Sequence, residues 1–464
     1  MKNTRYLLLA SAMGLLLSSA HALPPAQDRV YTADQNSNTV SVFNPATNML
    51  VGQIRLGNAR PDVLSPLYKG QINVHGLGFS PDHKTLLVIS NGSNAVSFID
   101  TATNKVKGTT YVGRSPHEGF FSADGKEVWV VVRGEDYVSV IDPVSFKETR
   151  RIQTGLGPGM VQFHPDGKLA FVISSFTAAV DVVDVKSHEV IRKIPVVSPF
   201  SPFLQFTPDG REVWMTHKDV GKVTRIDTKT LEVISVFDTG FITNHIAFAK
   251  VGGKVLAYVS IGGENMVKVY TTDRNAELLT TIPTGALPHG IWASDDSSRV
   301  YVGLENGDGV EVIDTASNKV IAHMGGGQAP QALVYLSHVV ESGDGSANLL
   351  PRGNGEPGNI RLQSVKGDAR GFVVLRNLGV VDALEVSLFK LKPATTYSVY
   401  VNGQSSVSGV FRTDAKGAVN GTMIGPVREL AASDGKNAGT INQIVVMEGG
   451  APADKANAVL LDSI

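Results

Sequence analysis

Four histidines recur at equivalent positions of an internal repeat, namely His75, His117, His245 and His289. Each stands just before a short apolar segment, and three further copies have Met160, Phe203 or Gln331 there. Neutral imidazole is the usual nitrogen ligand of zinc, copper and iron. The four side chains therefore indicate a transition-metal site or a polar site for a small ligand. Histidines that only hydrogen-bond their own loops are the third interpretation.

A second set of residues follows the second predicted strand of each copy. Its candidate ligand-binding members are Asn91, Arg133, Lys218 and Glu305. Gln331, at the histidine-equivalent position of the last copy, is a further ligand-binding candidate. Arg133 with Lys218 is suited to bind a carboxylate or a phosphate. Glu305 is suited to balance a cation or to act as a base. The alternative is that these charges are simply solvated loop residues.

Repeats of about 42 residues are the elements that must position these side chains. Aligning the copies on the last apolar residue of their first segment matches Phe79, Phe121, Phe163, Phe206 and Phe248. Each full copy has a short apolar strand, a turn such as residues 80–82, and three more strands separated by turns rich in Gly, Pro, Asp and Asn. Such a unit cannot bury both of its faces alone, so the copies are expected to stack radially as a β-propeller.

The two ends of the repeat region each carry part of one copy. Residues 30–57 have the pattern of strands two to four, whereas residues 331–335 have the pattern of a first strand alone. Six complete copies and this split copy predict an all-β fold, a seven-bladed β-propeller. Pairing the C-terminal inner strand with the N-terminal three would close the ring as a velcro and cover its open edges.

Alternating strand directions place both sets of candidate residues on one face of the ring. The connection entering each inner strand and the loop after the second strand lie on that face. In a seven-fold ring His75 and His117 are expected to face His245 and His289 across the funnel mouth. A long insertion, residues 58–74, enters one inner strand from this face and is either a lid or an irregular surface loop.

The composition changes after residue 337. We therefore predict a propeller over residues 23–337, a turn-rich linker over 338–358, and a small β-sandwich over 359–464. Strand patterns at 371–375, 385–389, 396–401 and 407–411 support the sandwich.

Residues 1–22 have the pattern of a secretory signal. Lys2 and Arg5 precede an apolar run, and Ala20-His21-Ala22 matches a cleavage site near Ala22. The run is shorter than the roughly 20 residues that span a bilayer, so no membrane insertion is expected after signal removal. The sequence thus predicts a periplasmic or secreted protein.

Charge and cysteine content exclude several classes of partner and cofactor. Removing the signal removes the charges of Lys2 and Arg5, so the formal net charge goes from −1 to −3. No basic stripe remains, and neither nucleic acid nor an anionic membrane is an expected partner. The chain has no cysteine, which excludes disulfides, thiolate metal ligands and a covalent c-type haem.

Segments 94–106, 116–125 and 139–142 resemble the repeats of YVTN-family β-propellers, the YncE-like propellers. That family is similar in fold to the haem d1 propeller of cytochrome cd1 nitrite reductase, to nitrous oxide reductase, and to lactonase-type enzymes. The resemblance to nitrous oxide reductase implies copper held by central histidines. This chain departs from that pattern at Met160, Phe203 and Gln331.

Three functions stay open at this point. The first is a non-enzymatic binding protein whose funnel takes a small molecule or a periplasmic or cell-surface protein. The second is a metal-dependent oxidoreductase, or an electron-transfer propeller, with copper or another transition metal on the four histidines. The third is lactonase-like hydrolysis, which needs a carboxylate-rich metal site, whereas the mouth offers mainly Glu118 and Glu305 as acids. The absence of a recognisable catalytic motif favours the binding protein.

Overall fold

The computed structural model describes residues 23–57, 72–352, 359–364, 366–377, 382–401, 407–425, 443–450, 454 and 456–462. The predicted signal and residues 58–71 of the predicted lid lie outside these residues. No helix among the described residues is long and apolar enough to cross a bilayer.

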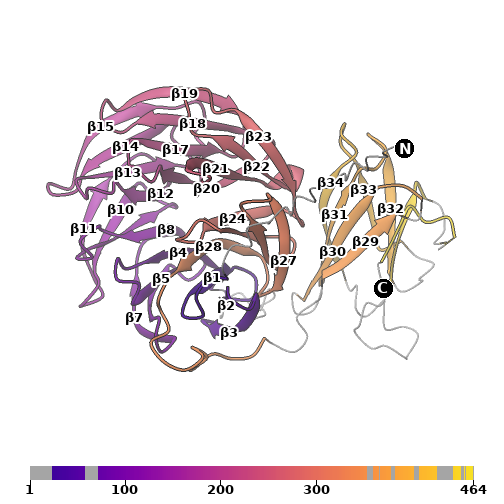
Figure 1. Cartoon of the computed structure of the whole chain (residues 1–464), viewed down its shortest axis with the longest axis horizontal. Helices are drawn as coiled ribbons and strands as arrows, with labels where there is room; N and C mark the ends of the chain where they lie inside the picture. The colour runs from indigo at the N-terminus through magenta and orange to yellow at the C-terminus, as the bar shows by residue number, and fades with distance from the viewer. Residues whose placement is uncertain are drawn as a thin grey trace, which may run out of the picture.

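Seven four-stranded antiparallel sheets, named here the first to the seventh, make up the larger part of the structure (Figure 1). In the first sheet the order is β28 (Pro330–Leu336), β1 (Arg29–Asp34), β2 (Thr39–Asn44) and β3 (Met49–Arg55). The second has β4 (Val74–Phe79), β5 (Thr85–Ser90), β6 (Ala95–Asp100) and β7 (Lys105–Tyr111). The third has β8 (Pro116–Phe121), β9 (Val128–Val132), β10 (Tyr137–Asp142) and β11 (Lys147–Gln153).

The remaining four sheets follow in chain order. The fourth has β12 (Pro158–Phe163), β13 (Leu169–Ser174), β14 (Ala179–Asp184) and β15 (Glu189–Pro195). The fifth has β16 (Leu204–Phe206), β17 (Glu212–His217), β18 (Lys222–Asp227) and β19 (Glu232–Asp238). The sixth has β20 (Thr243–Val251), β21 (Lys254–Ile261), the 3₁₀ turn η1 (Gly262–Glu264), β22 (Met266–Thr271) and β23 (Leu278–Pro283). The seventh has β24 (Pro288–Ala293), β25 (Arg299–Leu304), β26 (Gly309–Asp314) and β27 (Lys319–Gly325).

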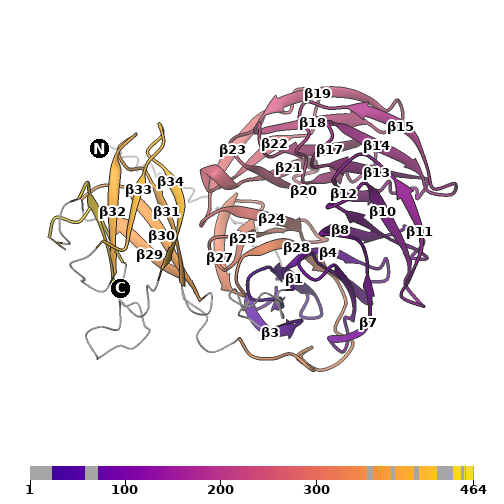
Figure 2. The ribbon, with the colours of Figure 1, turned by 180° about the vertical axis from the view of Figure 1, so that it is seen from behind.

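The sheets stand around an axis, with the first strand of each copy inside and the fourth outside (Figures 1 and 2). Each inner strand contacts the next, in the cyclic order β4, β8, β12, β16, β20, β24 and β28. The predicted pairing of the chain ends is present, because β28 runs antiparallel to β1 with Leu333 opposite Thr32. The chain is therefore an all-β, multi-bladed β-propeller.

Apolar side chains fill the space between neighbouring sheets. One cluster joins Trp129 and Val131 of the third sheet to Val161 and Val172 of the fourth. Trp129 is fully buried, which agrees with the packing role that its place in a repeat strand predicts. Because each sheet has a partner on both faces, both faces of its central strands are buried.

Residues 338–352 of the predicted linker make specific contacts with the propeller sheets. They are hydrogen-bonded along the rim where the inner strands end, which we call the lower rim. Asn104 Nδ2 donates to the carbonyls of Gly345 and Ala347, at 3.0 and 2.9 Å. Leu350 exchanges backbone hydrogen bonds with Gln53 of β3. Turn-forming residues therefore make a strap here, because several of their backbone groups find partners on the first and second sheets.

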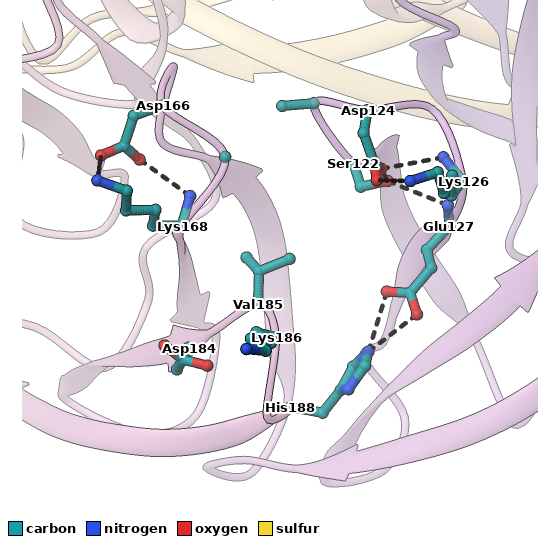
Figure 3. Close-up of a pocket in the computed structure, with 12 residues that line it drawn as sticks. Ser122, Asp124, Lys126, Glu127, Asp166, Lys168, Asp184, Val185, Lys186 and His188 are labelled. Carbon is teal, nitrogen blue, oxygen red and sulfur yellow. Dashed lines mark hydrogen bonds and ion pairs between the residues drawn. The ribbon is translucent and has the colours of Figure 1, made fainter.

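The lower rim also holds a cavity of about 820 Å³ between the third and fourth sheets (Figure 3). It is lined by turns that include Asp124, Lys126, Asp166 and Lys168. The ring of His188 lies 3.0 Å from the carboxylate of Glu127 and links the two sheets at this cavity. These turns lie at the opposite end of the inner strands from the candidate histidines.

The C-terminal part forms one eight-stranded sheet. Its order is β33 (Gly409–Arg412), β32 (Thr396–Val401), β35 (Ile444–Glu448), β36 (Leu460–Asp462), β29 (Asn359–Ser364), β30 (Arg370–Asn377), β31 (Asp382–Phe389) and β34 (Val419–Gly425). The four strands predicted from the sequence are present. Both halves contribute to one apolar core, for example Val386 and Val399. The described strands thus form one continuous hydrogen-bonded order whose two halves share a core, and the β-sandwich stays a prediction.

The strap predicts a stability effect at Asn104. Asn104→Gly removes both hydrogen bonds and keeps a residue suited to the φ of 57° at this position. The free energy of unfolding is expected to fall by about 1–3 kcal/mol in urea titrations. Asn48→Gly is the matched control, since Asn48 has a φ of 51° in the equivalent turn of the first sheet. Equal losses in the two variants would contradict a contribution from the strap.

Candidate functional site

The candidate histidines lie at the end of the ring where the inner strands begin, which we call the upper rim. His75, His117 and His289 are each the second residue of β4, β8 and β24, and His245 is the third residue of β20. The prediction that these residues precede their strands holds only for Phe203, which comes before β16. The other equivalent positions are inside strands.

A break in the strand pairing accompanies these positions. The register with the second strand shifts between Val74 and Gly76, between Pro116 and Gly119, and between Pro288 and Ile291. A bulge leaves one residue unpaired and redirects its side chain. The break therefore redirects the variable residue in these three sheets, whereas the pairing of β16 with β17 in the fifth sheet is regular.

The four histidines form two pairs of neighbouring rings. The ring centroids of His75 and His117 are 4.2 Å apart. Those of His245 and His289 are 4.8 Å apart, and Phe203 stacks on His245 at 4.0 Å. All four histidines are less than 9% exposed.

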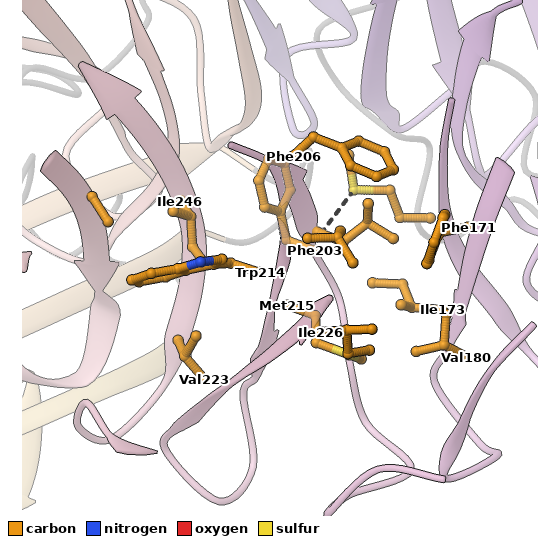
Figure 4. Close-up of a cluster of buried hydrophobic side chains, with 14 of the residues drawn as sticks. Phe171, Ile173, Val180, Phe203, Phe206, Trp214, Met215, Val223, Ile226 and Ile246 are labelled. Carbon is orange, nitrogen blue, oxygen red and sulfur yellow. Dashed lines mark hydrogen bonds between the residues drawn. The ribbon is translucent and has the colours of Figure 1, made fainter. Parts of the chain in front are cut away.

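Met160 and Phe203 give the funnel an apolar side. Both belong to the buried cluster that joins the fourth, fifth and sixth sheets, with Phe171, Trp214 and Ile246 (Figure 4). The backbone N–H of Leu204 donates to Met160 Sδ at 3.3 Å. The two positions that depart from histidine in these sheets therefore complete the core.

Burial keeps the histidines neutral. Desolvation, together with the nearby charges of Arg133 and Lys218, lowers the pKa of His75 to about 3. Desolvation also lowers the pKa of His117, His245 and His289 well below the usual value. Each ring therefore offers one N–H donor and one nitrogen lone pair at neutral pH.

Two cations lie among these rings. Arg133 follows β9, and its guanidinium lies 6.0 Å from the ring centre of Phe176 and 5.4 Å from that of Phe200. Desolvation lowers the pKa of both Arg133 and Lys218, whereas the charge of Glu305 acts to raise that of Lys218. Sequence reasoning missed the two phenylalanines, which come from loops of different sheets and share no motif.

The other predicted residues have different surroundings. Glu305 Oε2 lies 3.6 Å from His289 Nδ1. Gln331 is buried in β28. Asn91 donates its backbone N–H to the carbonyl of Asn73 in the loop after β5, and no contact of its side chain with the histidines occurs among the described residues.

The nitrogen atoms of the four histidines do not converge on one point. The one group of three metal-binding side chains that lie within 4.8 Å of one another, among the described residues, is His75, His117 and Glu118. His245 and His289 are outside it. The predicted metal site of four histidines stays a prediction, whereas two of its members, His75 and His117, lie close to Glu118.

The upper rim has an apolar half. Exposed apolar side chains occupy the loops of the fourth to sixth sheets, namely Leu156, Phe176, Val197, Val220 and Phe241. The corresponding loops of the first, second and seventh sheets, residues 35–38, 91–94 and 305–308, contain mainly Asn, Ser and Gly. The cations lie beside the apolar half, since Arg133 contacts Phe176.

His217 predicts how stability depends on pH. It is fully buried between Ser201 and Thr224, and desolvation lowers its pKa to about 4. An unfolded chain takes up this proton near pH 6.5, so stability is complete above that pH and falls as the pH decreases toward 4, by about 3 kcal/mol. His217→Gln is expected to make this dependence less steep in urea titrations between pH 4 and 7, while the buried histidines of the funnel keep their own contributions. His323→Gln, on the exposed side of β27, should keep it; an unchanged slope in His217→Gln would contradict the assignment.

Comparison with known proteins also identifies the chain as a β-propeller. The YNCE-like β-propeller family matches residues 119–350, and the chain belongs to this family. The uncharacterized protein YncE of Salmonella typhimurium is 38% identical over 66 residues. This match covers 14% of the present chain and only 18% of that relative.

Two solved structures have the same kind of fold. Hydrazine synthase of Kuenenia stuttgartiensis is 21% identical, with a TM-score of 0.52, and the match covers 56% of this chain and 89% of that one. A functionally unknown protein of Desulfotomaculum acetoxidans is 14% identical, with a TM-score of 0.57 and coverage of 66% and 98%. At these identities the likeness concerns the fold alone.

Proposed function

We propose that this chain is an exported β-propeller binding protein whose funnel binds a small anionic ligand. Residues 1–22 would direct export to the periplasm or beyond and be removed near Ala22. Residues 23–337 would form a closed ring of seven blades, and residues 359–464 a second domain joined through 338–358.

The observation that carries the proposal is the pair of cations at the upper rim. Neither Arg133 nor Lys218 has a carboxylate within 4.0 Å of its side-chain nitrogens among the described residues. Burial disfavours both charges, and Arg133 acts against the charge of Lys218, whereas Glu305 acts in its favour. A carboxylate or phosphate between them would relieve both effects, since such hydrogen bonds are charge-assisted and strong when water is excluded.

The surroundings support an organic anion. Neutral imidazoles can donate to a ligand without adding charge, and Nδ1 of His289 is buried with no hydrogen-bond partner. The apolar half of the rim is suited to a hydrocarbon or aromatic group beside the anion.

Calorimetric titration tests the proposal with benzoate, phenyl phosphate and inorganic phosphate. The full chain is expected to bind at least one organic anion, more weakly as salt increases. Arg133→Met and Lys218→Met remove the charge and keep an apolar side chain, and each is expected to weaken binding at least tenfold.

Arg150→Met is the matched control. Arg150 is exposed on β11, the outer strand of the sheet that also carries Arg133, and its loss should leave binding unchanged. The proposal is wrong if none of the three anions binds, or if Arg133→Met and Arg150→Met bind equally well.

A further inference from the structure

Three buried side chains from two neighbouring inner strands form a set of metal-binding atoms. His75 comes from β4, whereas His117 and Glu118 come from β8. One ligand atom of each lies within 4.8 Å of the others, and His75 Nδ1 is 3.8 Å from Glu118 Oε1. All three residues are less than 9% exposed, so they are not a chance grouping of surface side chains.

The two imidazoles have their ring nitrogens in suitable states. His117 Nδ1 donates to the carbonyl of Gly159 at 2.7 Å, which leaves Nε2 with its lone pair free. Such a second hydrogen bond is the usual way in which a protein orients a histidine ligand. His75 Nδ1 is buried and has no hydrogen-bond partner. A buried polar atom without a partner is uncommon and indicates a missing ligand, water or ion.

The carboxyl group of Glu118 is turned toward these rings. It is 3% exposed, and its nearest basic group among the described residues is the neutral ring of His75. Gly76 makes room for it, because a Cβ there would lie 2.7 Å from Glu118 Oε2 and 2.3 Å from the carbonyl oxygen of His117. A buried carboxylate is stable when it is paired with a cation or binds a metal.

We infer that His75, His117 and Glu118 bind one divalent first-row transition-metal ion at the upper rim. Two imidazoles and one carboxylate are a ligand set that proteins use for zinc and for non-haem iron, with open positions for a further ligand. Ligand atoms of a tetrahedral site with bonds of about 2.1 Å are about 3.4 Å apart. The ligand atoms lie within 4.8 Å of one another, so each pair would have to approach by at most about 1.4 Å to reach this separation.

The nearby cations act against a metal ion, and two features offset their effect. As a carboxylate ligand, Glu118 brings one negative charge to the bound ion. An anion between Arg133 and Lys218 would add another. The metal site uses other side chains than the proposed anion site, so each can be tested without the other.

Zinc binding by the full chain is the direct test. Protein dialysed against chelator is titrated with Zn²⁺ in a calorimeter, and the bound metal is counted by elemental analysis. One equivalent is expected. Glu118→Gln and His117→Gln are expected to lower the affinity at least a hundredfold, whereas His188→Gln, at the lower rim, should bind as the wild type does.

Two further variants distinguish this three-residue site from a four-histidine centre and from the proposed anion site. His289→Gln should keep its zinc, and an equal loss in His289→Gln and His75→Gln would replace the three-residue site by a four-histidine centre and overturn the inference. Arg133→Met should also keep its zinc, so failure of the anion proposal would leave this result intact. Absence of zinc binding by the wild type, or full binding by Glu118→Gln, overturns the inference.

A measurement on the wild-type protein tests the site even if the variants do not fold. Cobalt(II) in a site with nitrogen and oxygen ligands of low coordination number absorbs visible light far more strongly than hydrated cobalt. The wild type is expected to show this absorption at one equivalent and to lose it when Zn²⁺ is added. A spectrum of hydrated cobalt alone would contradict the site.

Discussion

The close approach of neighbouring inner strands is the constraint on which the upper rim depends. A Cβ at Gly78 of β4 would lie 2.1 Å from the carbonyl oxygen of Gly119 in β8, and one at Gly290 would lie 2.8 Å from that of Gln331. Only glycine fits at such contacts. Because the strands approach so closely, the rings of His75 and His117 stand side by side although they come from different sheets.

This packing also determines the electrostatics of the funnel. Imidazole rings that are crowded together and shielded from water stay neutral, and two cations beside them reinforce that state. The resulting surface has hydrogen-bond donors, nitrogen lone pairs and the positive charges of Arg133 and Lys218 in one place, with Glu305 acting on Lys218. Such a combination is suited to recognition of anions and of metal ions.

The ring scaffold and the site vary independently. The family match and the structural neighbours share the propeller, whereas the residues at the upper rim change from sheet to sheet within this one chain. A fold built from repeats can change one rim residue without disturbing the others, because each sheet contacts only its two neighbours. Function therefore has to be argued from the side chains of the funnel and cannot be transferred from the fold.

The order of the repeats, their four-strand pattern and the pairing of the two chain ends were determined by the sequence alone. Local turns and alternating strands recur at a constant spacing, and both are properties of short segments. The grouping of His75 and His117 at one rim followed from the same periodicity.

Only the tertiary structure decided which residues meet. Adjacent residues of a regular strand point to opposite faces, so the sequence alone predicts that the side chains of His117 and Glu118 lie apart. The register break at this point of β8 brings both side chains close to His75. The packing of Phe176 and Phe200 on Arg133, and of the segment from 338 to 352 on the lower rim, likewise joins residues far apart in the chain. These contacts depend on distances between sheets, which no local pattern of residues encodes.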